Sequence, residues 1–169
     1  MKTAGVILAV IVALALQTTL ARYVIRGTVA VDLVLVVVVY VGLTSGPVTG
    51  LLTGAIAGLA QDALSSGVIG IGGLAKTVVG FLTGIAGTQF IVGALFPRFV
   101  VFLAATVLHA IVFMGLYVLL DLRQFGALYA AVGGQALGNA IVGVIAFRLI
   151  EFLPGALERP DAQRSRIRG

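Results

Sequence analysis

The chain has 169 residues, of which 60% are hydrophobic and 10% are charged, with a net charge of +5 and a mean hydropathy of +1.20. Soluble domains carry about 25% charged residues and leave much of their surface in water, so this composition excludes a soluble globular protein. The sequence contains no cysteine, which excludes both a disulfide framework and a thiolate metal site.

Six apolar segments come close to the roughly 20 residues that a helix needs to cross a bilayer. Their approximate ranges are 4–20, 28–43, 48–64, 73–92, 99–120 and 125–150. The second is rich in valine, but it lacks the alternation of polar and apolar residues that membrane β-strands show. The sequence therefore predicts an all-α membrane protein. We expect a compact bundle of six transmembrane helices over residues 1–152 and a basic, disordered cytoplasmic tail over 153–169.

The breaks between these segments are short, so we expect consecutive helices to be antiparallel neighbours. Pro47 suits the first turn of the third helix, where a missing N–H costs nothing. The break over residues 65–72 is the least regular, and it is either a loop or a re-entrant segment.

The basic residues predict the orientation. If both termini are cytoplasmic, seven basic residues lie inside: Lys2, Arg98, Arg148 and the four arginines of the tail. Three lie outside: Arg22, Arg26 and Arg123. This bias satisfies the positive-inside rule and predicts a multi-pass protein with cytoplasmic N- and C-termini. The alternative is that the first segment is a cleaved signal peptide, but that segment is longer than a usual signal core.

Glycines recur at four-residue spacing on three predicted helices, which lets another helix approach closely. These glycine stripes are Gly50, Gly54 and Gly58; Gly80 and Gly84; and Gly134 and Gly138. We interpret them as packing sites within the bundle, and the alternative is that one stripe faces a separate partner protein. The first stripe leads directly into a polar stretch, so we expect it to be buried within the bundle.

That polar stretch, GLAQDALSSGVIGIGGLAK at residues 58–76, places Asp62 and Lys76 on either side of a glycine-rich break. In antiparallel neighbours the two charges reach a similar depth, so we expect them to pair and fix the turn. We then predict that Asp62→Ala alone harms folding more than the double change with Lys76→Ala, because a single change strands a buried charge. The alternative is a polar pocket that opens outward, where a ligand or partner replaces one member of the pair. The turn would supply hydroxyls and a flexible backbone from Ser65, Ser66, Gly67, Gly70, Gly72 and Gly73.

Other polar residues in apolar segments have plain structural interpretations. Asp32 lies near the start of the second helix, where the helix dipole and two preceding arginines favour an acid. We expect the lone His109 to be hydrogen-bonded to a neighbour rather than to relay protons. Gln135 and Asn139 share a face of the sixth helix and suit bonds to other helices.

No pattern for catalysis or cofactor binding emerges. GIGGLAKT at 70–77 resembles a phosphate-binding loop, but Ala75 replaces the second glycine, and the strand that such loops follow is missing. The same objection applies to the looser dinucleotide pattern GIGGLA. The sequence shows no metal-ligand spacing and no Ser/His/Asp set at a common depth, so we expect no enzyme, no cofactor and no nucleic-acid partner.

Residues 46–88 resemble the core of the rod shape-determining protein MreD family. The resemblance is carried by the glycine-spaced helix and by the motif Gly58-Leu59-x-x-Asp62, followed by Ser65/Ser66-Gly67, Gly70 and Gly73-Leu74-Ala75. Lys76 is not part of the family pattern. The resemblance implies a non-enzymatic scaffold of the bacterial elongation (rod) complex in the inner membrane, which supports cell shape and lateral peptidoglycan synthesis. The implied partners are an MreC-like protein, MreB, RodA and a penicillin-binding transpeptidase.

The family is also similar in architecture to the six-helix substrate-binding subunits of energy-coupling-factor vitamin transporters. Such a subunit is the alternative hypothesis for this chain. Those subunits usually carry more aromatic and polar side chains around their ligand, whereas this chain has no tryptophan.

Overall fold

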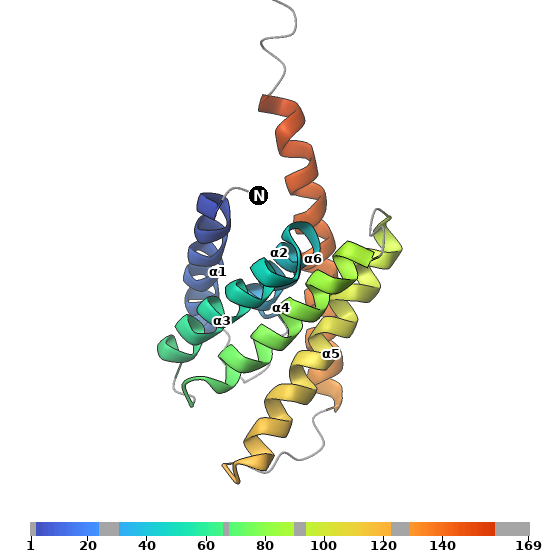
Figure 1. Cartoon of the computed structure of the whole chain (residues 1–169). Helices are drawn as coiled ribbons and strands as arrows, with labels where there is room; N and C mark the ends of the chain where they lie inside the picture. Colours follow the sequence, from blue (N-terminus) through green and yellow to red (C-terminus); the bar gives the residue numbers. More distant parts are fainter. Residues whose placement is uncertain (1–2, 24–30, 66–67, 90–93, 123–128, 158–169) are drawn as a thin grey trace, which may run out of the picture.

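The computed structural model describes residues 3–23, 31–65, 68–89, 94–122 and 129–157, and all regular structure in these ranges is helical (Figure 1). The helices are α1 (Thr3–Tyr23), α2 (Leu33–Ser45), α3 (Pro47–Leu64), α4 (Ile71–Gln89), α5 (Leu95–Leu119) and α6 (Tyr129–Leu157). Within these ranges, three helical segments are long and apolar enough to cross a membrane, namely Ile71–Gln89, Leu95–Leu119 and Ala130–Glu151. The all-α expectation is confirmed, and passage of all six helices through the membrane stays a prediction.

The short helix α2 lies at the centre of the bundle and contacts each of the other five helices. Most of its valines are buried, namely Val34, Val36, Val38, Val39 and Val41, while Val37 is partly buried. Helix α1 packs on one side of α2, while α5 and α6 pack together on the other (Figure 1). A valine-rich run is therefore compatible with a helix here, because burial in the bundle outweighs the weak preference of β-branched residues for strands.

Helix α2 begins later than the predicted residue 28. Asp32 is its N-cap, with an extended backbone (φ −104°, ψ 94°), and its Oδ1 accepts a hydrogen bond of 3.0 Å from the Leu35 amide. An aspartate in this position satisfies an otherwise unpaired amide of the first turn. Residues 24–30, which precede this cap, lie outside the described residues, and they include Arg26, one of the two arginines expected to favour an acid at Asp32.

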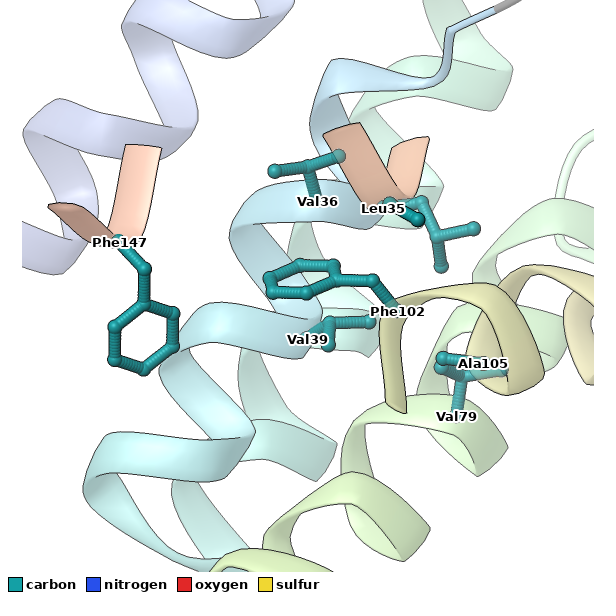
Figure 2. Packing of buried hydrophobic residues seen from close by; sticks show 8 residues of the cluster. Leu35, Val36, Val39, Val79, Phe102, Ala105 and Phe147 are labelled. Atoms are coloured by element: carbon teal, nitrogen blue, oxygen red, sulfur yellow. The ribbon is translucent and has the colours of Figure 1, made fainter. Parts of the chain in front are cut away.

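One hydrophobic cluster joins α2 to α4, α5 and α6 (Figure 2). Phe102 of α5 is 1% exposed and lies against Val36 and Val39 of α2. Phe147 of α6 approaches Phe102 edge-on, with ring centroids 6.5 Å apart. A second cluster joins α1, α2 and α3 through Ala13, Val34, Val38 and Ala57. The two clusters hold α2 from opposite sides.

Helices α3 and α4 lie side by side and meet through their glycines (Figure 1). A Cβ added to Gly50 or Gly80 would lie within 3.0 Å of the backbone of the other glycine, and one added to Gly54 would meet the backbone of Lys76. A Cβ on Gly58 would lie 2.6 Å from the Cα of Gly73. The first two glycine stripes thus allow the α3 and α4 backbones to touch, as their spacing predicts.

The stripe on α6 behaves differently. An added Cβ at Gly134 would meet nothing within 4 Å, and Gly134 is exposed, while Gly138 is partly buried. The prediction that Gly134 packs inside the bundle was wrong, because this residue lies on an exposed part of α6 with no neighbour for an added Cβ.

An ion pair joins the first turn of α5 to the C-terminal part of α6. Arg98 Nη2 lies 2.5 Å from Glu151 Oε1, and the guanidinium carbon of Arg98 lies 4.2 Å from the centre of the Phe147 ring. Helix α6 continues past this contact to Leu157, so its last turns project beyond the other helices (Figure 1). Most of the predicted tail, residues 158–169, lies outside the described residues.

A polar cavity at the start of α2 as the candidate functional site

A cavity of about 290 Å³ lies between the start of α2, the α3–α4 turn and α5. Its polar lining includes Asp32 at the start of α2, Gln61 and Asp62 on α3, Lys76 on α4, His109 on α5 and Gln135 on α6. Phe113, Met114 and Tyr117 of α5 form an apolar wall. The sequence-derived polar stretch and the isolated polar residues of three other elements are thus brought together in one place.

A buried ion pair forms the inner end of this cavity. Lys76 Nζ lies 2.9 Å from Asp32 Oδ2, and the two side chains are 3% and 7% exposed. The same Nζ lies 3.3 Å from His109 Nε2. The lysine ammonium therefore has a carboxylate and an imidazole as partners, which is the arrangement that an intramembrane charge requires. The expectation that His109 is hydrogen-bonded to a neighbour is met by Lys76.

Polar side chains of α1 and α6 form hydrogen bonds with the backbone of residues 31–33, around Asp32. Asn139 of α6 is fully buried, and its Oδ1 accepts from the Asp32 amide at 2.7 Å, while its Nδ2 donates to Thr106 Oγ1 at 3.0 Å. Gln17 of α1 donates to the Val31 carbonyl at 3.2 Å and accepts from the Leu33 amide at 2.9 Å. These bonds and the ion pair fix the start of α2 from α1, α4 and α6, and we call this set of contacts the α2 clamp.

The predicted pair between Asp62 and Lys76 was wrong. Asp62 is 8% exposed, and its Oδ2 accepts from the amides of Gly70 at 2.9 Å and Gly73 at 3.0 Å. This carboxylate therefore stabilises the turn before α4 and the N-terminus of α4, where unpaired amides and the helix dipole both favour an anion. Lys76 lies beyond its reach because α4 begins at Ile71, two residues earlier than predicted, which places the lysine in the second turn.

We expect Asp62→Ala to lower the free energy of unfolding by roughly 1–3 kcal/mol, because it leaves two amides near the α4 N-terminus without their acceptor. Its effect should add to that of Lys76→Met, since the two side chains share no partner. The measurement is unfolding in mixed micelles, followed by circular dichroism, for both single variants and the double variant. If the double variant loses clearly less free energy of unfolding than the two single variants together, then Asp62 and Lys76 interact and the original pair hypothesis is correct.

The other residues predicted for the turn have local roles. Gly70 has φ +105°, a conformation that favours glycine, and it is the residue just before α4. Gly73 lies against Leu59, whose side chain an added Cβ would meet at 3.0 Å. Ser65 is the C-cap of α3 and its Oγ donates to the Gln61 carbonyl at 2.7 Å, so its hydroxyl serves the helix end. Ser66 and Gly67 lie outside the described residues.

Four features of the site were missed from the sequence: the capping role of Asp32, its ion pair with Lys76, the anchoring role of Gln17 and the identity of Thr106 as a partner of Asn139. An N-cap signal was present, because Asp32 immediately precedes an unbroken apolar run. Gln17 and Thr106 carried no signal of their own, since neither belongs to a recognisable motif and the partner of each is distant in the sequence.

The charged groups of the cavity have identified partners. Among the described residues there is no group of three or more His, Cys, Asp or Glu side chains that would hold a metal ion. Lys76 is engaged by Asp32 and His109, and Asp62 by backbone amides. The charged side chains of the cavity are thus held in fixed positions, which suits a preorganised recognition surface.

In the comparison with protein families, the chain matches the model of the rod shape-determining protein MreD over residues 1–153. The chain belongs to the MreD family. No curated protein and no solved structure matches the chain. Membership assigns the chain a role in rod shape determination as a component of the inner membrane. The described helices that are long enough to span a bilayer agree with that location. The similarity in architecture to energy-coupling-factor subunits stays a prediction.

Proposed function

We propose that this MreD-family protein is a non-enzymatic scaffold of the bacterial elongation complex. In this role it binds an MreC-like protein and, with MreB, RodA and a penicillin-binding transpeptidase, supports lateral peptidoglycan synthesis. Family membership supports the cellular role. The observation that carries the binding role is the preorganised polar cavity beside the α3–α4 turn.

The proposed topology places this cavity at the outer face of the membrane. Six spans with cytoplasmic termini put the α3–α4 turn outside, together with the C-terminal end of α5 and the N-terminal end of α6. The cavity is lined from these ends by Asp62, Val68, Tyr117 and Gln135. A partner with a transmembrane helix in the same bilayer would place the residues that follow this helix, on the outer side, at the depth of the cavity.

The packing of the glycine stripes narrows the choice of partner surface. The glycine stripes of α3 and α4 are buried in the contact between these two helices, so another protein cannot bind to them. The cavity rim, in contrast, carries an exposed side chain, Val68, at 43%. The rim is therefore the surface through which we propose that the partner is bound.

The arrangement also favours a scaffold over the transporter subunit. The α2 clamp closes the inner end of the cavity, and the cluster around Phe102 fills the space between α2, α4, α5 and α6. A cavity that ends on an ion pair and a packed core suits a fixed docking site.

Two neighbouring residues of the turn allow a matched test of this proposal. Val68 lines the cavity, and Ile69 is exposed beside it without lining it. We expect Val68→Trp to reduce co-purification with a co-expressed MreC-like protein about tenfold or more, because indole at the rim blocks entry, whereas Ile69→Trp leaves it unchanged. Circular dichroism of both variants controls for folding. If the wild-type chain and the MreC-like protein never associate while both are folded, the scaffold proposal fails.

A further inference from the structure

The hydrogen-bonding state of the cavity indicates what kind of group it would accept. Gln61 Oε1 is buried and has no hydrogen-bond partner, and it is the one such side-chain atom in the described part of the chain. Gln61 lines the cavity, and an unsatisfied buried acceptor costs roughly 1–3 kcal/mol. Since the missing partner is a donor, a group that brings N–H into the cavity removes this cost.

Asp62 offers a second acceptor in the same place. Both of its hydrogen bonds from backbone amides end on Oδ2, and Oδ1 takes neither of them. Gly72, which also lines the cavity, lies so close to Oδ1 that a Cβ there would collide with it. Glycine at residue 72 therefore keeps this oxygen accessible. Gln61 and Asp62 are adjacent on α3, so both acceptors belong to one end of the cavity.

Charge and shape favour a cation. The charged side chains of the lining are Asp32, Asp62 and Lys76, so two carboxylates against one ammonium leave one negative charge with His109 neutral. The wall opposite is aromatic, because Phe113 stacks on His109 at 5.7 Å and meets Tyr117 at 4.9 Å between ring centroids. Aromatic faces attract ammonium and guanidinium groups. A volume of about 290 Å³ is at the low end for ligand pockets and suits a small head group.

We infer that the cavity is a binding site for a primary ammonium group, which donates N–H to Gln61 Oε1 and Asp62 Oδ1 and lies against the Phe113 ring. This site goes beyond the scaffold role and does not depend on it. The ammonium belongs either to a soluble amine or to the head group of phosphatidylethanolamine in the surrounding membrane. Both sources present the same charge and the same N–H donors.

The first test uses the purified full-length protein in nanodiscs of phosphatidylcholine, which lacks N–H donors. Calorimetric titration with n-butylammonium is compared with n-butyltrimethylammonium, which keeps the charge but cannot donate. We expect n-butylammonium to bind at least about tenfold more tightly. Gln61→Met, which keeps the length of the side chain without its acceptor, should remove most of this difference, and Gln61→Glu should increase it.

The second test distinguishes the lipid source. The protein is prepared in nanodiscs with equal amounts of phosphatidylethanolamine and phosphatidylcholine, and native mass spectrometry identifies the lipid that stays bound. Retained phosphatidylethanolamine, lost in Gln61→Met, identifies the lipid head group. Binding of n-butylammonium without lipid preference identifies a soluble amine. The inference is overturned if neither occurs, or if folded Gln61→Met behaves like the wild type in both tests.

Discussion

Lys76→Met is expected to lower the free energy of unfolding by on the order of 3–5 kcal/mol, because it leaves the Asp32 carboxylate without its ammonium inside the bundle. The expected loss is large because Asp32 is buried, lies 2.9 Å from Lys76 and carries the start of α2. Asp32→Asn should have an effect of similar size, since it strands the Lys76 ammonium while keeping an oxygen to cap the Leu35 amide.

The double variant Asp32→Asn/Lys76→Met separates the charge from the packing. Without either charge, the cost of desolvation disappears, and most of the stability should return. The three free energies of unfolding are measured in mixed micelles and compared as a double-mutant cycle. Losses that simply add in the double variant would show that the ion pair is not what holds the start of α2.

Gly80→Ala is expected to destabilise the bundle by about 3 kcal/mol, at the upper end for overpacking. The added methyl group would lie on the carbonyl of Gly50, and neither backbone can move without separating α3 from α4. Gly134→Ala is the matched control, because its methyl group would meet nothing within 4 Å. We expect that variant to be unchanged or up to about 1 kcal/mol more stable, since alanine favours a helix more than glycine does.

Both glycine variants can be compared by thermal unfolding in the same detergent. If Gly80→Ala and Gly134→Ala change the unfolding temperature equally, then Gly80 is not in a tighter helix contact than Gly134, and the account is wrong. Destabilisation by Gly134→Ala alone would indicate that α6 packs on another chain.

Much of the fold follows from local signals in the sequence. Pro47 begins α3, as its missing amide predicts, and the spacing of Gly50, Gly54 and Gly58 predicts the contact with α4. These features depend on one helix and its neighbour in the chain, so hydropathy, proline and glycine are sufficient to find them.

The centre of the site could not be predicted in the same way. Whether Lys76 meets Asp62 or Asp32 depends on where α4 begins, and a shift of two residues moves a side chain by about 3 Å along the helix and about 200° around it. The bond between Asn139 and the Asp32 amide joins residues far apart in the sequence, and it exists only because α2 starts inside the bundle. The sequence indicates that Asn139 bonds to another helix, but it carries no signal for which partner that is.

The most direct test of the scaffold account is photo-crosslinking in native membranes. Benzoylphenylalanine is placed at Val68 on the cavity rim and, as a control, at Ile145, which is 52% exposed on α6. The account predicts that the rim position captures an MreC-like protein and that the control position does not. Capture of a paired ATPase module with its membrane coupler from the rim, without an MreC-like protein, would contradict the scaffold and indicate a transporter subunit.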